Sequence, residues 1–163
     1  NAEDPEYYLR RDYRGNYDIN GSLFLQADCI LGESGNLTIY GHNMNSGAMF
    51  GNLDLYANET YYQEHPFTYL QTEDGIQEYR IVTVLKADLE LLPFQKKLAD
   101  AEAVQEYLKA AKQREVFETG DDYLTCIYDK VLTLVTCSYE WNGARNIVLA
   151  VPVSGAVWSQ KCS

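Results

Sequence analysis

The sequence predicts one mainly β domain, a mostly antiparallel barrel or sandwich that carries short helices on its loops. Two observations support this prediction. Short runs of β-branched and aromatic residues recur along the 163 residues, separated by turn signals. In contrast, only residues 100–115 have the apolar spacing of a longer amphipathic helix. The length is ordinary for a single domain, so we expect residues 1–163 to form one.

The composition argues against several classes of protein. The formal net charge is -11, whereas a nucleic-acid-binding surface needs a basic stripe. The same charge argues against docking of the domain itself on anionic lipid. No run reaches the roughly 18 apolar residues of a membrane span, and no signal peptide is present, so we expect any membrane anchor to lie outside this sequence. The acidic surface favours solubility; the alternative is a partly acidic groove for neutral or basic peptide.

The first two predicted strands lie before the first histidine. Residues 22–26 form a short strand that Gly21 opens, and a turn cluster follows at residues 32–36. Residues 37–40 are β-formers and predict a second strand. This strand leads directly to His42, so we expect the histidine at a sheet edge.

The middle of the chain changes from helical to β patterning. Apolar spacing over residues 49–56 indicates a helical segment, and a second short helix starts near Asn58 and closes near Pro66. Residues 67–70 and 78–86 are then predicted strands.

The second half contains the long helix and two apolar strands. Asp100 is the expected N-cap of the helix at residues 100–115. Residues 130–137 and 145–151 are the strands, and the Asn-Gly pair at 142–143 predicts a turn between them. One helix face is apolar and comprises Ala103, Val104, Tyr107, Leu108 and Ala111.

Three residues indicate nucleophilic chemistry. Cys137 ends an apolar strand, where a thiolate could be formed by a nearby imidazole. His42 is a better partner than His65, which lies in what reads as an exposed helix end. Arg145 opens the next strand, so across a hairpin its guanidinium could stabilise an oxyanion beside the cysteine. For each residue alone a structural role is the open alternative: a small buried thiol, or a solvated arginine at a strand edge.

The remaining cysteines do not suggest a metal site. Cys29, Cys126 and Cys162 are widely spaced and no Cys-x-x-Cys pair occurs, so a zinc centre is not expected. We interpret all three as structural or incidental. A disulfide between Cys29 and either Cys126 or Cys162 is left open.

Three sequence blocks resemble those of sortases. Residues 40–44, Tyr-Gly-His-Asn-Met, with residues 47–53, Gly-Ala-Met-Phe-Gly-Asn-Leu, resemble the histidine block of class B sortases. Residues 133–137, Thr-Leu-Val-Thr-Cys, resemble the cysteine block of sortases in general, and residues 144–148, Ala-Arg-Asn-Ile-Val, the arginine block. The resemblance extends over about residues 7–153 in the same order. The helix at 100–115 resembles the one that class B members insert before the cysteine strand.

The resemblance implies a closed or nearly closed sortase-type β-barrel and a cysteine transpeptidase. It implies Cys137 as nucleophile, His42 as general acid/base and Arg145 as oxyanion stabiliser, without a metal or other cofactor. The sorting signal of a secreted surface protein, of the Asn-Pro-x-Thr-x type, would be cut after Thr and transferred to a peptidoglycan amine on the outer face of a Gram-positive cell. The substrate-binding residues would be Leu9, Asn43, Thr136 and Ser138.

Some features depart from the family pattern, and other functions stay open. Val135 stands where class B members often have serine, which removes one substrate hydrogen bond. The family's N-terminal helices and first strand have no counterpart in this sequence, so we expect another segment to cover the exposed sheet edge. The alternatives are a sortase that joins pilin subunits, a cysteine peptidase that uses water, and a non-catalytic binding module.

Overall fold

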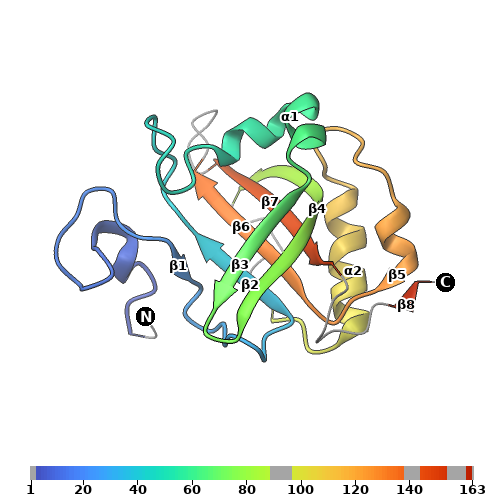
Figure 1. The fold of residues 1–163 in the computed structure, drawn as a ribbon, viewed down its shortest axis with the longest axis horizontal. Coiled ribbons are helices and arrows are strands. Elements are labelled where there is room, and N and C mark those ends of the chain that lie inside the picture. Colours follow the sequence, from blue (N-terminus) through green and yellow to red (C-terminus); the bar gives the residue numbers. More distant parts are fainter. Residues whose placement is uncertain (1–2, 89–96, 138–143, 154–160, 163) are drawn as a thin grey trace.

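The computed structural model describes residues 3–88, 97–137, 144–153 and 161–162, and these form a curled six-stranded sheet with helices around it. The strand order is β1-β2-β6-β7-β4-β3. Figure 1 shows how these strands curl into a half-barrel. The mainly β, barrel-type prediction is therefore confirmed. The six strands are β1 (Phe24–Leu25), β2 (Asn36–Tyr40), β3 (Phe67–Thr72), β4 (Gly75–Asp88), β6 (Val131–Cys137) and β7 (Ala144–Pro152).

Strand pairing is antiparallel except at one place. β2 pairs with β6 in parallel, whereas the other neighbouring strands of this sheet run antiparallel. The parallel pair was not foreseen, because residues far apart in sequence form it. It has a direct consequence: β2 and β6 end at the same edge of the sheet, where Tyr40 is the register partner of Val135. The chain segments that follow these two strands therefore begin side by side.

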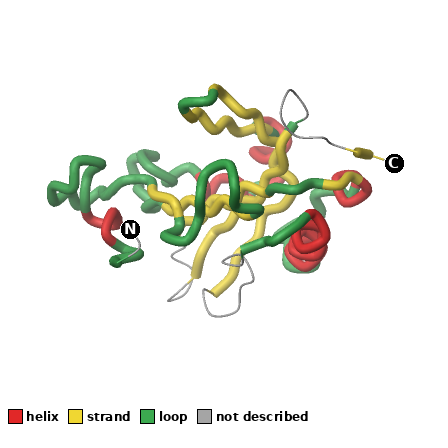
Figure 2. The backbone as a smooth tube through the Cα atoms, turned by 90° about the horizontal axis from the view of Figure 1, so that it is seen from below, coloured by secondary structure: helices red, strands yellow, loops and turns green. Residues whose placement is uncertain are grey.

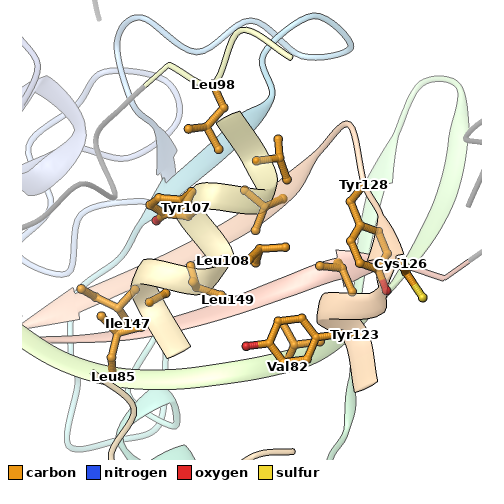
Figure 3. Close-up of a cluster of buried hydrophobic side chains, with 14 of the residues drawn as sticks. Val82, Leu85, Leu98, Tyr107, Leu108, Tyr123, Cys126, Tyr128, Ile147 and Leu149 are labelled. Atoms are coloured by element: carbon orange, nitrogen blue, oxygen red, sulfur yellow. The ribbon is translucent and has the colours of Figure 1, made fainter. Parts of the chain in front are cut away.

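The central strand β7 is buried on both faces, which explains its nearly continuous apolar run. The side chains on one face pack under helix α2, and Figure 3 shows this cluster, with Leu108, Ile147 and Leu149 among its members. The other face packs against a second cluster that includes Leu53 and Val148. Apolar burial on both faces of one strand fixes the register of its neighbours.

The long helix agrees with the sequence prediction. Helix α2 spans Ala101–Lys112, and the Asp100 carboxylate accepts a hydrogen bond from the backbone N–H of Ala103 at 2.9 Å. Its buried residues are Val104, Tyr107, Leu108 and Ala111, and Ala103 is partly buried against the same cluster.

Of the two helices predicted after the histidine, the first is shorter than expected and the second forms where it was predicted. A 3-10 helix, η2, spans Leu53–Ala57, and α1 spans Glu59–Glu64 with the Asn58 side chain as its N-cap. Met49 and Phe50 precede both helices: Met49 forms an isolated antiparallel bridge with Asn43, and Phe50 lies in a turn, so the predicted helical start at residue 49 is wrong. The physical reason lies in the backbone: Met49 has a φ of 53°, outside the right-handed helical region.

The N-terminal segment lies at one end of the molecule and α2 towards the other (Figures 1 and 2). It begins with a 3-10 helix, η1 (Tyr7–Arg10), and a further 3-10 helix, η5 (Asp122–Thr125), precedes β5 (Cys126–Ile127). β5 pairs with β8 (Lys161–Cys162) in a separate two-stranded sheet. Within the described residues, no helix combines the length and apolarity that a bilayer crossing requires.

Candidate active site

Strand pairing brings the predicted cysteine and arginine positions together. The described part of β6 ends at Cys137, and its register partner on β7 is Arg145. Directly opposed residues of an antiparallel pair have their Cβ atoms on the same face of the sheet, about 4.5–5.5 Å apart. The Arg145 Nη1 donates to the backbone carbonyl of Ala144 at 2.9 Å, which anchors the guanidinium close to its own strand.

The segment that carries His42 is bonded to the end of β6. The backbone N–H of Gly41 donates to the Val135 carbonyl at 3.1 Å, and the Thr136 hydroxyl donates to the Gly41 carbonyl at 2.8 Å. Gly41 also has no room for a side chain, because a Cβ there would lie 2.7 Å from the Phe50 ring. His42 is therefore held beside the last residues of the cysteine strand.

The N-terminal segment contacts the histidine ring. The backbone carbonyl oxygen of Leu9 lies 2.5 Å from Nε2 of His42. A carbonyl can only accept a hydrogen bond, so this contact requires the proton on Nε2. In the neutral ring, Nδ1 is then the atom that exchanges a proton with another group.

A cavity of about 520 Å³ lies where these elements meet. This volume is within the range of a ligand site, and both His42 and Arg145 line it. Residues of the N-terminal segment and of β1 contribute to its lining beside the end of β6. Its other lining residues are Pro5, Glu6, Leu9, Phe24, Gln26, Ala27, Asp28, Tyr40, Gly41, Val135 and Thr136.

Part of the cavity wall is organised by hydrogen bonds and ring contacts. The Tyr40 hydroxyl donates to Gln26 Oε1 at 3.1 Å, and Gln26 Nε2 donates to Asp28 at 2.6 Å. The rings of Phe24 and Tyr40 stack with centroids 5.6 Å apart. The carboxylates of Glu6 and Asp28 on this wall agree with the partly acidic groove that the net charge left open.

The predicted substrate contacts fall into three groups. Leu9 and Thr136 line the cavity with His42 and Arg145. Asn43 is not among the lining residues, and its side-chain amide donates to Asp54 instead. Ser138 lies outside the described residues.

Sequence reasoning missed several residues of this wall. Phe24, Gln26 and Asp28 were not singled out, because only the antiparallel pairing of β1 with β2 brings them next to Tyr40. The signal that could have identified Phe24 was an aromatic residue in a short strand immediately before the histidine strand.

The second histidine lies elsewhere. His65 is the C-cap residue of α1, as its sequence context predicted, and its ring stacks on Tyr61 with centroids 4.0 Å apart. It does not line the cavity with His42.

The cysteines other than Cys137 differ in state. Cys126 is disulfide-bonded, whereas Cys29 is a free thiol. The alternatives that paired Cys29 with Cys126 or Cys162 are therefore wrong. Cys29 is half-buried, and burial raises the pKa of its thiol.

Among the described parts of the chain, no three His, Cys, Asp or Glu side chains gather where they could hold a metal ion.

Comparison with known protein families identifies one match over most of the chain. Residues 7–153 match the family model of the sortase domain. The chain is 28% identical over 145 residues to sortase B of Listeria monocytogenes and 22% identical over 146 residues to sortase B of Staphylococcus aureus. These alignments include 85% and 88% of this chain but 56% and 59% of the two relatives. The chain thus spans somewhat more than half the length of these relatives.

Solved structures show the same fold. The X-ray structure of Clostridium perfringens sortase B superposes with a TM-score of 0.82 at 26% identity, covering 93% of this chain and 84% of that one. A complex of Staphylococcus aureus sortase B with its substrate has a TM-score of 0.79 at 19% identity, covering 94% of this chain and 72% of that one. At this identity the second likeness concerns the fold alone.

Proposed function

Because the chain belongs to the sortase family, we propose that it is a class B cysteine transpeptidase that cuts a sorting signal after Thr and joins it to a cell-wall amine. The proposal assigns Cys137 as nucleophile, His42 as general acid/base and Arg145 as oxyanion stabiliser. Leu9 and Thr136 are proposed to contact the peptide from the cavity wall.

One observation carries the proposal. His42 and Arg145 line a single cavity, and Arg145 is the register partner of Cys137 at the end of β6. Three residue types that acyl transfer requires therefore come from three separate segments to one edge of the sheet. A cysteine with only a packing role would not need a histidine and an arginine beside it.

The first half-reaction forms a thioester. The Cys137 thiolate attacks the carbonyl carbon of the Thr residue in the signal, and a C–S bond forms. The carbonyl oxygen gains negative charge, which the Arg145 guanidinium stabilises by donating hydrogen bonds. A guanidinium carries five N–H donors, so it can keep its bond to Ala144 at the same time. The C–N bond then breaks, and the leaving amine takes a proton from the His42 imidazolium.

The second half-reaction releases the product. An incoming amine attacks the thioester carbonyl and gives its proton to His42, the new C–N bond forms and the Cys137 thiolate leaves. Nε2 of His42 faces Leu9, so Nδ1 is the atom that carries this proton in each direction. The Leu9 carbonyl accepts a hydrogen bond from Nε2 in both the neutral and the protonated ring.

The substrate class follows from the cavity and the family. We propose an extended peptide of the Asn-Pro-x-Thr-x type along the groove and a peptidoglycan precursor amine as acceptor. Sortases are enzymes of the Gram-positive cell envelope, and we propose that this domain acts at the outer face of the membrane, held by an anchor outside this sequence. The disulfide at Cys126 suits an oxidising compartment.

The test is a product assay with a synthetic peptide of the Asn-Pro-x-Thr-x type and triglycine or a diaminopimelate-type amine. Wild-type protein should yield peptide joined to the amine, detected by mass spectrometry. Cys137→Ala should abolish both cleavage and joining, while its circular dichroism and melting temperature stay those of the wild type. Full activity in Cys137→Ala would refute the assignment.

The same assay separates the other candidate functions. Cleavage that yields only free acid, even with excess amine, would indicate a cysteine peptidase with water as acceptor. Joining to a pilin lysine in preference to a cell-wall amine would indicate a pilin-polymerising sortase. A thiol probe that fails to label Cys137 ahead of the half-buried Cys29 would favour a binding module without catalysis.

A further inference from the structure

Outside the cavity, one carboxylate connects the histidine segment with the arginine strand. Asp54, in η2, accepts a hydrogen bond from Asn43 Nδ2 at 2.5 Å and another from Asn146 Nδ2. Asn43 directly follows His42 in the chain, and Asn146 directly follows Arg145. A single side chain thus joins the two segments that carry proposed catalytic groups.

Both amides donate to this carboxylate from largely buried positions. Asn43 is 8% exposed and Asn146 4% exposed, so water is a poor substitute as a partner. The carbonyl oxygen of the Asn146 side chain is buried and has no hydrogen-bond partner among the described residues. The bond to Asp54 is therefore the side-chain contact that fixes the Asn146 amide. Hydrogen bonds to an ionised acceptor are about twice as strong as those between neutral groups.

The connection continues through backbone and side-chain bonds to His42. Asn146 is the register partner of Thr136, and the Thr136 hydroxyl donates to the carbonyl of Gly41. On its other side, the His42 carbonyl accepts from the backbone N–H of Phe50 at 3.0 Å. The histidine segment is thus attached to β6 before His42, to the turn at Phe50, and through the bond from Asn43 to Asp54 also to η2. Without Asp54, the side-chain attachment of Asn43 to η2 is lost.

Asp54 does not itself face the substrate. It is absent from the residues that line the cavity, whereas His42 and Arg145 are both present. Any effect of Asp54 on the reaction must therefore act through the placement of these two residues. Misplacement of a reacting group by about 1 Å is enough to lower a rate by about 10²-fold.

We propose that Asp54 is a positioning residue of the transpeptidase, which sets His42 and Arg145 relative to each other by holding Asn43 and Asn146 together. This inference rests on the proposed function. It assigns a role to a carboxylate that makes no contact with the reacting atoms.

The first test compares Asp54→Asn with wild type in the peptide–triglycine assay. The substituted amide keeps the shape of the side chain but has one acceptor oxygen, so it can serve only one of the two asparagines as an acceptor. We expect kcat to fall about 10- to 100-fold with KM for the peptide changed less than about threefold. Asp122→Asn is the matched control, because the same change there removes only the surface partner of Arg80 and should leave kcat unchanged.

A rescue variant separates positioning from a general loss of stability. In the double variant Asp54→Asn/Asn146→Asp, the new amide can donate to the new carboxylate and still accept from Asn43. We expect kcat of this double variant to be at least tenfold higher than kcat of Asp54→Asn. Asn146→Asp alone should have a lower kcat than both Asp54→Asn and the double variant, since two carboxylates would then face each other.

The outcomes are distinguishable. A kcat for Asp54→Asn within twofold of wild type would overturn the inference. So would a loss of kcat that tracks a lower melting temperature and disappears on cooling, because the residue would then only support the fold. If wild-type protein forms no peptide–amine product at all, the proposed function fails and this inference fails with it. A loss of kcat in Asp54→Asn that is recovered in the double variant supports the positioning role of Asp54.

Discussion

The carbonyl oxygen of Leu9 lies 2.5 Å from Nε2 of His42, although the two residues are 33 positions apart in the chain. The position of this carbonyl depends on Gly21, which has a φ of 62° and is buried against it. A Cβ at Gly21 would lie 2.8 Å from both the Leu9 carbonyl carbon and the Tyr8 oxygen. The N-terminal segment can therefore contact the histidine only if residue 21 has no side chain.

Gly21→Ala should therefore impair catalysis at a distance. The new methyl group displaces the Leu9 carbonyl, and His42 loses the partner that fixes its tautomer. We expect kcat/KM in the peptide–amine assay to fall about 10- to 100-fold.

Gly32→Ala is the matched control for this prediction. Gly32 has a φ of 84°, so alanine there carries a similar backbone penalty, but a Cβ would meet no atom within 4 Å. We expect both variants to lose comparable stability in urea unfolding and only Gly21→Ala to lose activity. Equal activity of the two variants would show that the Leu9 contact has no role in the reaction.

The strands and the long helix could be predicted because their patterns are local. Asp100 caps α2 as expected, and the apolar runs that end at Cys137 and begin near Arg145 form neighbouring strands. The Leu9–His42 contact could not be predicted in this way. It depends on a 3-10 turn whose carbonyl group has no signature in the side-chain sequence, and on a parallel strand pair formed by distant segments.

Replacement of Arg145 should lower turnover more than binding. Arg145→Met removes the donors that we assign to the oxyanion, and loss of one such donor costs about 10²–10³ in kcat. Arg145→Lys keeps the charge but not the planar fork of donors, so we expect only partial activity. Steady-state kinetics with the sorting peptide should show kcat reduced and KM nearly constant. An increase in KM at unchanged kcat would instead mark Arg145 as a residue for substrate binding.

The Thr136 hydroxyl should contribute to both stability and activity. It donates to the buried Gly41 carbonyl at 2.8 Å, and valine has the same shape without the donor. Thr136→Val leaves this carbonyl without that partner, so we expect the free energy of unfolding to fall by about 1–3 kcal/mol. Because Gly41 precedes His42, turnover should fall as well.

Thr125→Val provides the comparison for Thr136→Val. The Thr125 hydroxyl donates to the Asp122 carbonyl at 2.7 Å within an exposed turn, where water can replace it. We expect a change of less than about 0.5 kcal/mol in urea unfolding and unchanged turnover. Equal effects of the two substitutions would remove the special role of the bond from Thr136 to Gly41.

The polar network around Asp54 illustrates a second limit of sequence reasoning. The family resemblance predicted Asn43 as a substrate contact, yet its amide donates to Asp54 in η2. Asp54 lies outside the sequence blocks that resemble the family, and Asn146 lies inside the arginine block without a signal that pairs it with Asp54. Their proximity results from the packing of η2 on the face of the sheet opposite α2, which only the folded chain reveals.

The free energy of unfolding should fall at alkaline pH, because several phenol groups that can lose a proton are buried or half-buried in the folded chain. Burial raises the pKa of Tyr123 to about 12, although its hydrogen bond with Thr83 acts in the opposite direction, and burial likewise raises that of Tyr56 to about 12. The folded chain therefore keeps protons that the unfolded chain releases once the pH exceeds about 10. The stabilisation from these groups is fully present below pH 10 and is lost as the pH rises towards 12. Urea unfolding between pH 8.5 and 11.5 should show a free energy of unfolding that falls progressively as the pH rises, with a larger share from the buried Tyr123 than from the half-buried Tyr56. Tyr123→Phe should be less stable than wild type at pH 8.5, because the Thr83 hydroxyl loses a hydrogen-bond partner. Its free energy of unfolding should, however, fall less steeply with pH than that of the wild type. An unchanged dependence on pH would exclude Tyr123 as one of the groups responsible.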